Sequence, residues 1–316
     1  MKMKYSSNDL GYLCSILAEN TGKRNNENIF KKEIIVTQSA GMTAWLKTEL
    51  ARQNKVIANV AFMNQDSLLS EIFQFFFNKR PANTRDILRF SVYELLADKE
   101  FTSSFPEVAG YYTDSPLRRI QLAGKISELF DQYQLYRPEM IFRWEAGEYS
   151  SDKPSDAEKW QQWLWRKAGI ESRVTVRDKV LSEVEKNVSD FKKSFPRISI
   201  FGITVFTRFH LEFFNKLSEY IQVEMYLCLP TDKTSFNNEL LLSYGDKAIE
   251  LADLVEKHFC DTGEFIKLPF NTETDLGRIQ NSILNNTNEI EFKDDESVQI
   301  NSCYTPAREA ECLYNY

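Results

Sequence analysis

The sequence predicts an α/β protein in which a parallel sheet is interrupted by a large, all-helical insertion. Two strand–helix–strand patterns, in residues 33–62 and 198–229, predict the sheet, because consecutive parallel strands need a crossover helix between them. Between residue 66 and about residue 190, apolar side chains recur every three or four positions, which is typical of helices. The length of 316 residues suggests about two domains.

The first strand–helix–strand pattern begins with a run rich in β-branched residues, from Glu33 to Thr37. Gly41 predicts a tight turn, and the apolar spacing that follows predicts a helix ending near residue 54. A further apolar run at residues 56–62 predicts the next strand. This first pattern therefore supplies one pair of parallel strands.

The helical insertion contains three tryptophans, Trp160, Trp163 and Trp165, in a helix predicted over residues 156–168. Aromatic side chains at helical spacing usually pack against neighbouring helices. We therefore interpret these tryptophans as packing residues rather than as a cofactor site.

The second strand–helix–strand pattern starts after Pro196, where the apolar period returns to that of strands. It predicts a strand, a helix and a strand, in this order, at residues 198–203, 206–221 and 223–229. Pro230 ends the last of these strands.

The C-terminal part of the chain is less regular. A helix is predicted over residues 238–259, and a strand over residues 297–303. Pro306 then opens an amphipathic helix, because proline is favoured at the first position of a helix. This helix has no stop signal before Tyr316, so we expect the natural protein to continue.

The changes of pattern divide the chain into four segments. The α/β domain is predicted to be built from two separate parts of the chain, with the helical insertion between them. The predicted segments are the first α/β part at 1–62, the insertion at 63–194, the second α/β part at 195–296, and the start of a following segment at 297–316.

The composition excludes several classes of protein. No apolar run approaches the roughly 20 residues that cross a bilayer, and no secretory signal is visible, so we expect a cytoplasmic protein without membrane segments. Five cysteines without a C-x-x-C pair are expected to be reduced thiols. Only two histidines are present, and we predict neither a metal site nor a cofactor.

The net charge of −7 argues against a protein that coats nucleic acid through a strongly basic face. The charge is unevenly distributed, however. Residues 1–60 hold nine basic and five acidic side chains, whereas residues 231–316 hold seven basic and 17 acidic ones. We interpret the acidic region as a solvated surface, and the first segment as the one that could contact phosphates.

Residues 36–46 have the context of a phosphate-binding loop without its chemistry. If Gly41, Met42 and Thr43 stand where such a loop has Gly-Lys-Thr, then Met42 replaces the lysine that binds the β- and γ-phosphates. A neutral thioether cannot offset the charge of a triphosphate, so we predict that this loop does not hydrolyse ATP. An ordinary strand-to-helix turn explains the same residues equally well.

No catalytic pattern occurs elsewhere, but one polar stripe can bind bases. Glu128, Asp131 and Gln132 lie on one face of a predicted helix, ahead of Arg137. Most such stripes are simply solvated. Arginine and glutamine can nevertheless hydrogen-bond to the edges of guanine and adenine, which makes the end of this helix a candidate DNA contact.

Five segments together resemble the RecC family, the gamma chains of exodeoxyribonuclease V. They are 36–46 (VTQSAGMTAWL), 129–133 (LFDQY), 136–138 (YRP), 200–203 (IFGI) and 304–309 (YTPARE). The likeness runs from about Tyr5 to the end of the chain. It covers only about the first third of a RecC-type protein.

The resemblance implies a superfamily 1 helicase fold whose ATP site is inactive. It also implies a non-catalytic subunit of a RecBCD-type helicase–nuclease, with a RecB-like helicase–nuclease and a RecD-like helicase as partners. Such a subunit channels single-stranded DNA from an unwound duplex end and scans it for the recombination hotspot sequence Chi during double-strand break repair.

The resemblance further implies a set of DNA-contacting residues. These are Gln38, Glu128, Leu129, Asp131, Gln132, Arg137 and Arg177. Other contact positions of the family are changed here, to Ala40, Ala44, Asn64 and Ser70. Because lost hydrogen-bonding and stacking groups alter which bases are read, we expect a different hotspot sequence or none.

Two alternative functions stay open at this point. The first is an active superfamily 1 NTPase or a related AddB-type subunit, which Met42 disfavours. The second is an α/β domain that binds only proteins, which the acidic total charge favours.

Overall fold

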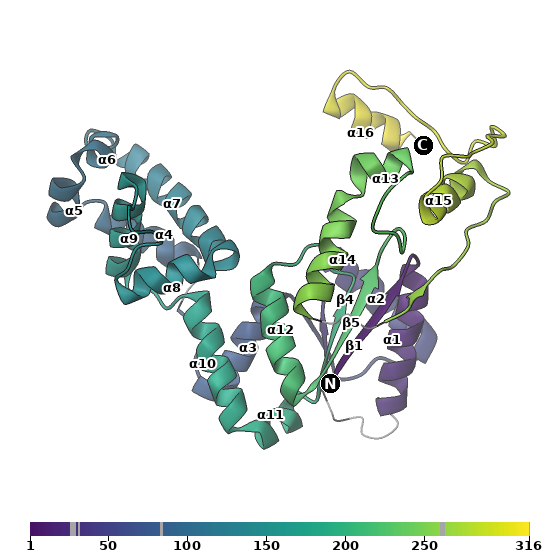
Figure 1. The fold of residues 1–316 in the computed structure, drawn as a ribbon, viewed down its shortest axis with the longest axis horizontal. Helices are drawn as coiled ribbons and strands as arrows, with labels where there is room; N and C mark the ends of the chain where they lie inside the picture. The colour runs from purple at the N-terminus through teal and green to yellow at the C-terminus, as the bar shows by residue number, and fades with distance from the viewer. Residues whose placement is uncertain (26–29, 31, 83–84, 260–262, 316) are drawn as a thin grey trace.

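A computed structural model describes residues 1–25, 30, 32–82, 85–259 and 263–315. A six-stranded sheet, with every strand pair parallel, lies at the centre of one lobe (Figure 1). The strand order is β3-β2-β4-β5-β1-β6. The strands are β1 Lys2–Ser7, β2 Glu33–Val36, β3 Val60–Met63, β4 Arg197–Phe201, β5 Gln222–Cys228 and β6 Phe265–Ile266. The prediction of an α/β fold with a parallel sheet is confirmed.

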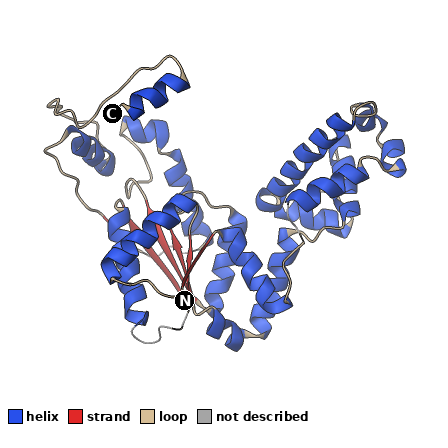
Figure 2. Ribbon diagram, turned by 180° about the vertical axis from the view of Figure 1, so that it is seen from behind, coloured by secondary structure: helices blue, strands red, loops and turns tan. Residues whose placement is uncertain are grey.

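Helices cover both faces of this sheet and form a second lobe beside it (Figure 2). Those of the sheet lobe are α1 Leu10–Asn25, α2 Ala40–Asn54, α3 Gln65–Phe77, α10 Arg173–Lys186, α11 Val188–Ser194, α12 Arg208–Tyr220, α13 Glu239–Tyr244 and α14 Asp246–His258. Those of the helical lobe are α4 Arg85–Leu95, α5 Lys99–Ser104, α6 Pro106–Gly110, α7 Pro116–Tyr136, α8 Pro138–Ala146 and α9 Asp156–Ala168. Towards the C-terminus follow α15 Asp275–Asn285 and α16 Pro306–Tyr314.

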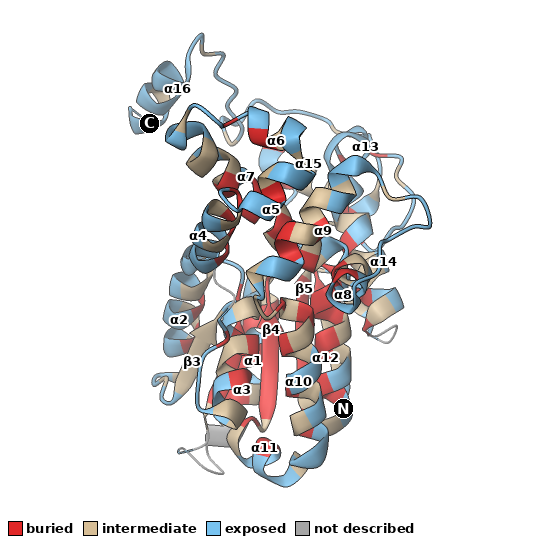
Figure 3. Ribbon diagram, turned by 90° about the vertical axis from the view of Figure 1, so that its left-hand side faces the viewer, coloured by how far each residue is buried: buried red, intermediate tan, exposed pale blue. Residues whose placement is uncertain are grey.

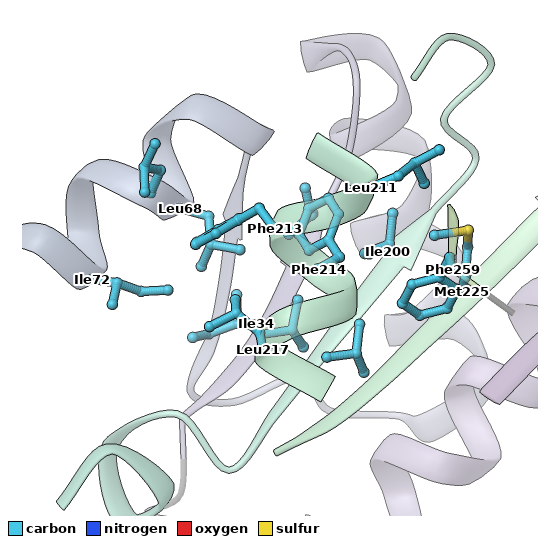
Figure 4. Close-up of a cluster of buried hydrophobic side chains, with 14 of the residues drawn as sticks. Ile34, Leu68, Ile72, Ile200, Leu211, Phe213, Phe214, Leu217, Met225 and Phe259 are labelled. Carbon is cyan, nitrogen blue, oxygen red and sulfur yellow. The ribbon is translucent and has the colours of Figure 1, made fainter. Parts of the chain in front are cut away.

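The sheet has a separate apolar core on each face, because side chains alternate along a strand. Ile35 of β2 points to the face covered by α1 and α2, where Leu13 and Leu46 are fully buried. Ile34 points to the opposite face, which α3, α10, α12 and α14 cover. Figure 4 shows this larger core, with Phe213 and Phe214 of α12 above the sheet.

The helical lobe has a core of its own. Its buried side chains come from α4 to α9, and Phe130, Trp144 and Trp165 lie at its centre. Trp160 and Trp163 pack against the same cluster, as the interpretation of the tryptophans as packing residues requires. The predicted segments 1–62, 63–194, 195–296 and 297–316 stay a prediction. The packing assigns α3, α10 and α11, which lie within 63–194, to the core on the sheet.

Two sequence predictions of secondary structure in the C-terminal part of the chain are wrong. Residues 297–303 form no strand, and Ile300 in the middle of this run is 93% exposed. The single helix predicted over 238–259 is two helices, α13 and α14, which meet at Gly245. A Cβ atom at Gly245 would lie 2.4 Å from the carbonyl oxygen of Leu241, so only glycine fits this junction.

Three buried charges join neighbouring strands within the sheet. Arg197 of β4 lies 2.8 Å from a carboxylate oxygen of Glu33 on β2 and 3.1 Å from one of Glu224 on β5. All three side chains are at most 5% exposed. Tyr226 donates a hydrogen bond of 2.8 Å to the same Glu224 carboxylate. These contacts tie together three strands from distant parts of the chain.

No helix in the described ranges is both long and apolar enough to cross a bilayer. Cys14, Cys228, Cys303 and Cys312 are free thiols, in agreement with the expectation from their spacing, and Cys260 lies outside the described residues. Burial raises the pKa of both the Cys14 and the Cys228 thiol to about 11, so neither is a ready nucleophile at neutral pH.

Candidate functional site

The first candidate site lies where β2 and β4 end side by side. The chain leaves β2 into α2, which covers one face of the sheet, and it leaves β4 into α12, which covers the other. Figure 3 shows α2 and α12 on opposite sides of β4. In open α/β sheets, ligands bind outside the carboxyl ends of two such strands. The predicted phosphate-loop residues and Gln38 are therefore placed where a nucleotide site would be expected.

Gln38 links the two loops that follow these strands. Its Oε1 atom accepts hydrogen bonds of 2.9 Å from both the backbone N–H and the hydroxyl of Thr204. Gln38 itself is exposed. The side chain thus reaches across the ends of β2 and β4 and remains accessible from solvent.

Met42 fills the space between the two loops. It lies in the first turn of α2, and its backbone N–H donates to the hydroxyl of the N-cap residue Ser39 at 3.1 Å. Its methyl carbon is 3.0 Å from the position that a Cβ atom would take at Gly202. Gly202 adopts φ +61°, the left-handed region that glycine occupies without strain. The thioether of Met42 and the backbone of Gly202 therefore meet between the two loops.

The residues of the predicted loop differ in detail from the expectation. Gly41 does not form a tight turn but lies within the first turn of α2, because that helix already begins at Ala40. The hydroxyl of Thr43 lies 2.7 Å from that of Thr37, so the two side chains hydrogen-bond to each other across the β2–α2 connection. The connection is held by the protein's own side chains.

The second candidate site, at the end of α7, is connected to the sheet lobe by a chain of polar contacts. Asp131 of α7 accepts a 2.8 Å hydrogen bond from Arg173 at the start of α10. The same guanidinium lies 2.6 Å from Asp66 of α3. Asp66 in turn lies 3.3 Å from Nε2 of His210, whose Nδ1 lies 2.9 Å from the Thr207 hydroxyl.

The Asp66 carboxyl stays ionised in this chain of contacts. Burial acts to raise the pKa of Asp66, but the hydrogen bond from His210 and the charge of Arg173 outweigh burial and hold the pKa at about 2. Asp131 and Asp66 thus share one guanidinium between the two lobes. Reasoning from the sequence missed Asp66, Arg173 and His210, because the contacts join residues that are far apart in the chain.

The other predicted contact residues fall into two groups. Glu128 lies 3.4 Å from Arg85 and 3.3 Å from Lys125, and Arg177 lies 3.6 Å from Glu212 with its guanidinium 4.9 Å from the ring of Phe209. These charges are neutralised by the protein itself. The side chains of Leu129, Gln132 and Arg137 follow α7 to its end.

Gln132 and Arg137 are the exposed members of the set on α7. The Arg137 guanidinium lies 5.5 Å from the centre of the Tyr133 ring, which orients it without neutralising it. Both side chains present donors of the kind that pair with base edges. Within the described ranges, no cluster of three or more His, Cys, Asp or Glu side chains could hold a metal ion.

Comparison with known proteins gives the family. Residues 3–286 match the family model described as RecC, N-terminal domain. The RecBCD enzyme subunit RecC of Haemophilus influenzae is 28% identical over 281 residues, which cover 78% of this chain and 24% of the relative. That of Escherichia coli is 25% identical over 241 residues, which cover 72% and 21%. That of Buchnera aphidicola subsp. Schizaphis graminum is 23% identical over 341 aligned residues, which cover 98% and 32%.

This chain thus spans between about a fifth and a third of the length of these relatives. The family match extends from β1 to the end of α15, so it includes both candidate sites and both lobes. On this match the chain belongs to the RecC family, as its N-terminal domain.

Proposed function

We propose that this chain is the N-terminal part of a non-hydrolysing, DNA-handling subunit of a RecBCD-type helicase–nuclease. In this role it works in the cytoplasm with a RecB-like helicase–nuclease and a RecD-like helicase, and it guides single-stranded DNA from an unwound duplex end. The RecC relatives, which are named as RecBCD enzyme subunits, support this assignment.

The observation that carries the non-hydrolysing role is the contact of Met42 with Gly202. The place where a helicase-like fold would bind triphosphate is filled by a thioether and lacks the lysine that phosphate transfer needs. We therefore describe Gly41, Met42 and Thr43 as a degenerate phosphate loop in an inactivated, superfamily 1 helicase-like domain.

The DNA path that we propose runs along Gln38 and the end of α7. Gln38, Gln132 and Arg137 are exposed and would contact bases, whereas lysines and arginines of the basic first segment would contact phosphates. The other proposed contacts, Glu128, Leu129, Asp131 and Arg177, would border the path. In this proposal the subunit scans the strand for a Chi-like hotspot. Because four contact positions are changed, we expect a hotspot sequence that differs from that of the familiar relatives, or none.

Addition of Mg-ATP is expected to leave the melting temperature of the chain unchanged. A ligand that binds only the native state stabilises it, by about 2.7 kcal/mol at 100 times its Kd. Differential scanning fluorimetry with and without Mg-ATP measures this directly, with Mg-ADP and magnesium alone as controls. A concentration-dependent rise that needs the nucleotide would favour the alternative, an active superfamily 1 NTPase or AddB-like subunit.

Arg137→Ala is expected to change the sequence preference of single-stranded DNA binding more than its overall strength. One bidentate contact to a base edge contributes about 1–3 kcal/mol of discrimination. Fluorescence anisotropy with labelled oligonucleotides of different sequence, at two salt concentrations, measures both quantities. Arg143→Ala is the matched control, since Arg143 is an exposed arginine on the next helix, α8.

Three outcomes of this titration are distinguishable. A uniform loss on all sequences would contradict base reading by Arg137 and leave only a phosphate contact. Absence of binding even at low salt would favour the other alternative, a domain that contacts only proteins. An equal change in DNA binding by the Arg143→Ala control would show that the effect comes from the loss of one positive charge, not from Arg137 itself.

A further inference from the structure

A pocket in the helical lobe has the composition of a nucleotide-binding surface. It has a volume of about 380 Å³ and lies along α9, between the end of α5 and the loop that follows α8. Its lining consists of three aromatic side chains, three cations and one amide, namely Phe105, Tyr149, Trp163, Lys159, Arg166, Lys167 and Gln162. No carboxylate lines it.

Contacts with neighbouring side chains fix the position of Trp163 in this α9 pocket. The indole N–H of Trp163 donates to Glu100 at 3.3 Å, and the ring packs against Phe101 with the ring centres 5.3 Å apart. Tyr149 is 37% exposed and stands on the loop after α8. The exposed Tyr149 ring is directly available for a base to stack on. The Lys167 ammonium lies 5.2 Å from the centre of the Trp163 ring, so a base stacks on Trp163 when Lys167 moves to the phosphate.

The cations of the α9 pocket are available to an anion. Lys159 pairs with Asp156 and Lys167 pairs with Glu100, each at 2.8 Å, but Asp156 is 97% and Glu100 59% exposed at the side chain. Such exposed pairs are weak and exchange readily with a phosphate group. Arg166 forms no ion pair with any described residue, and its guanidinium lies against Gly147.

We propose that the α9 pocket binds one nucleotide of single-stranded DNA. The base stacks on Tyr149 and Trp163, and the phosphate lies against Arg166 and Lys167. The volume is within the range of about 300–1,000 Å³ typical of small-ligand sites. The choice of DNA as the ligand rests on the proposed function, but the pocket shares no residue with the contacts proposed on α7 and after β2.

Arg166→Ala and Tyr149→Ala are each expected to weaken the binding of a labelled oligo(dT) about tenfold. Arg166→Ala should also lower the salt dependence, by about 0.7 in the slope of log K against log salt, because one phosphate contact is lost. Both side chains are partly or fully exposed, so neither change removes a core residue. Lys216→Ala, on α12 of the other lobe, is the control, since Lys216 is also an exposed cation but does not line the α9 pocket.

Photocrosslinking locates the contact independently of affinity. An oligo(dT) that carries 5-bromodeoxyuridine is expected to crosslink to Trp163 or Tyr149, as mapped by mass spectrometry of the digested chain. Crosslinks confined to other parts of the chain would overturn the proposal. Displacement of the oligonucleotide by thymidine monophosphate at equal nucleotide concentration would also overturn it, because the ligand would then be a free nucleotide.

Failure of this proposal is separable from failure of the proposed function. If oligo(dT) binds and the α9 variants bind as tightly as the unchanged chain, the pocket is not a contact and the α7 path stands. If the α9 variants lose binding whereas Arg137→Ala changes nothing, the pocket stands and base reading at α7 is wrong. Absence of any binding of single-stranded DNA overturns both.

Discussion

Arg197→Ala is expected to lower the free energy of unfolding by about 3–5 kcal/mol, because it removes the guanidinium that pairs with two buried carboxylates. Glu33 and Glu224 lie on the strands either side of Arg197, and all three side chains are at most 5% exposed. Burial acts to lower the pKa of Arg197, but Glu224 and Glu33 outweigh it and hold the pKa above its usual value. The arginine is therefore charged at every pH at which the protein folds. Urea denaturation followed by circular dichroism measures the change.

Two further variants separate the charge from the shape of the arginine. Arg197→Lys keeps the charge but loses the fork that faces two carboxylates, so a smaller loss of stability is expected. Arg208→Ala removes an exposed arginine that pairs with Glu212 on the same helix, and a change below about 0.5 kcal/mol is expected. Equal losses for Arg197→Ala and Arg208→Ala would show that the buried charges are not coupled as the geometry requires.

Trp144→Ala is expected to cost about 3–5 kcal/mol, the usual cost of removing a buried tryptophan, but only within the helical lobe. Trp144 is 1% exposed, its ring centre lies 6.2 Å from that of Phe130, and its indole N–H donates to Glu158. Because this core is separate from the two cores on the sheet, we expect local rather than global unfolding. Hydrogen exchange with mass spectrometry should show lost protection in α7 to α9 and retained protection in β4 and β5.

Phe142→Ala is the matched control for this change. Phe142 lies on the same helix, α8, but is 60% exposed, so its removal should leave the exchange pattern almost unaltered. Equal loss of protection in both lobes of the Trp144→Ala chain would mean that the lobes unfold as one unit. Trp144→Ala also removes the hydrogen bond from the indole to Glu158, which lies on α9, the helix that lines the α9 pocket.

The sequence predicted those elements whose pattern is local. The strands β2, β4 and β5 have apolar runs bounded by turn residues, and α12 has a clear amphipathic period. β1 was missed because Lys2 and Lys4 make the run look polar, although the apolar Met3 and Tyr5 alternate with them. This alternation was a usable signal, since strands of period two place every second side chain on one face.

The candidate sites were predictable only in part, because their contacts join residues that are far apart in the chain. The missing lysine at Met42 can be read from the sequence, but its contact with Gly202 depends on a strand that follows about 160 residues later. Asp131 was identified as a polar residue on a helix, whereas its partner Arg173 depends on how α7 meets α10. The α9 pocket was hidden because tryptophans at helical spacing are explained equally well by packing.

The buried charges also bear on the order in which the chain folds as it is synthesised. Glu33 leaves the ribosome long before Arg197 and Glu224, because more than half of the chain lies between Glu33 and Arg197. The strand β2 can therefore pair with β4 only late in synthesis. The core of the helical lobe draws on a single continuous stretch, from Leu88 to Ile170, that is complete before β4 appears. Domains generally fold as units during synthesis, N-terminal ones first. The helical lobe can therefore fold before β4 is made. Until then, the edge of β2 that pairs with β4 in the finished sheet lacks this neighbour.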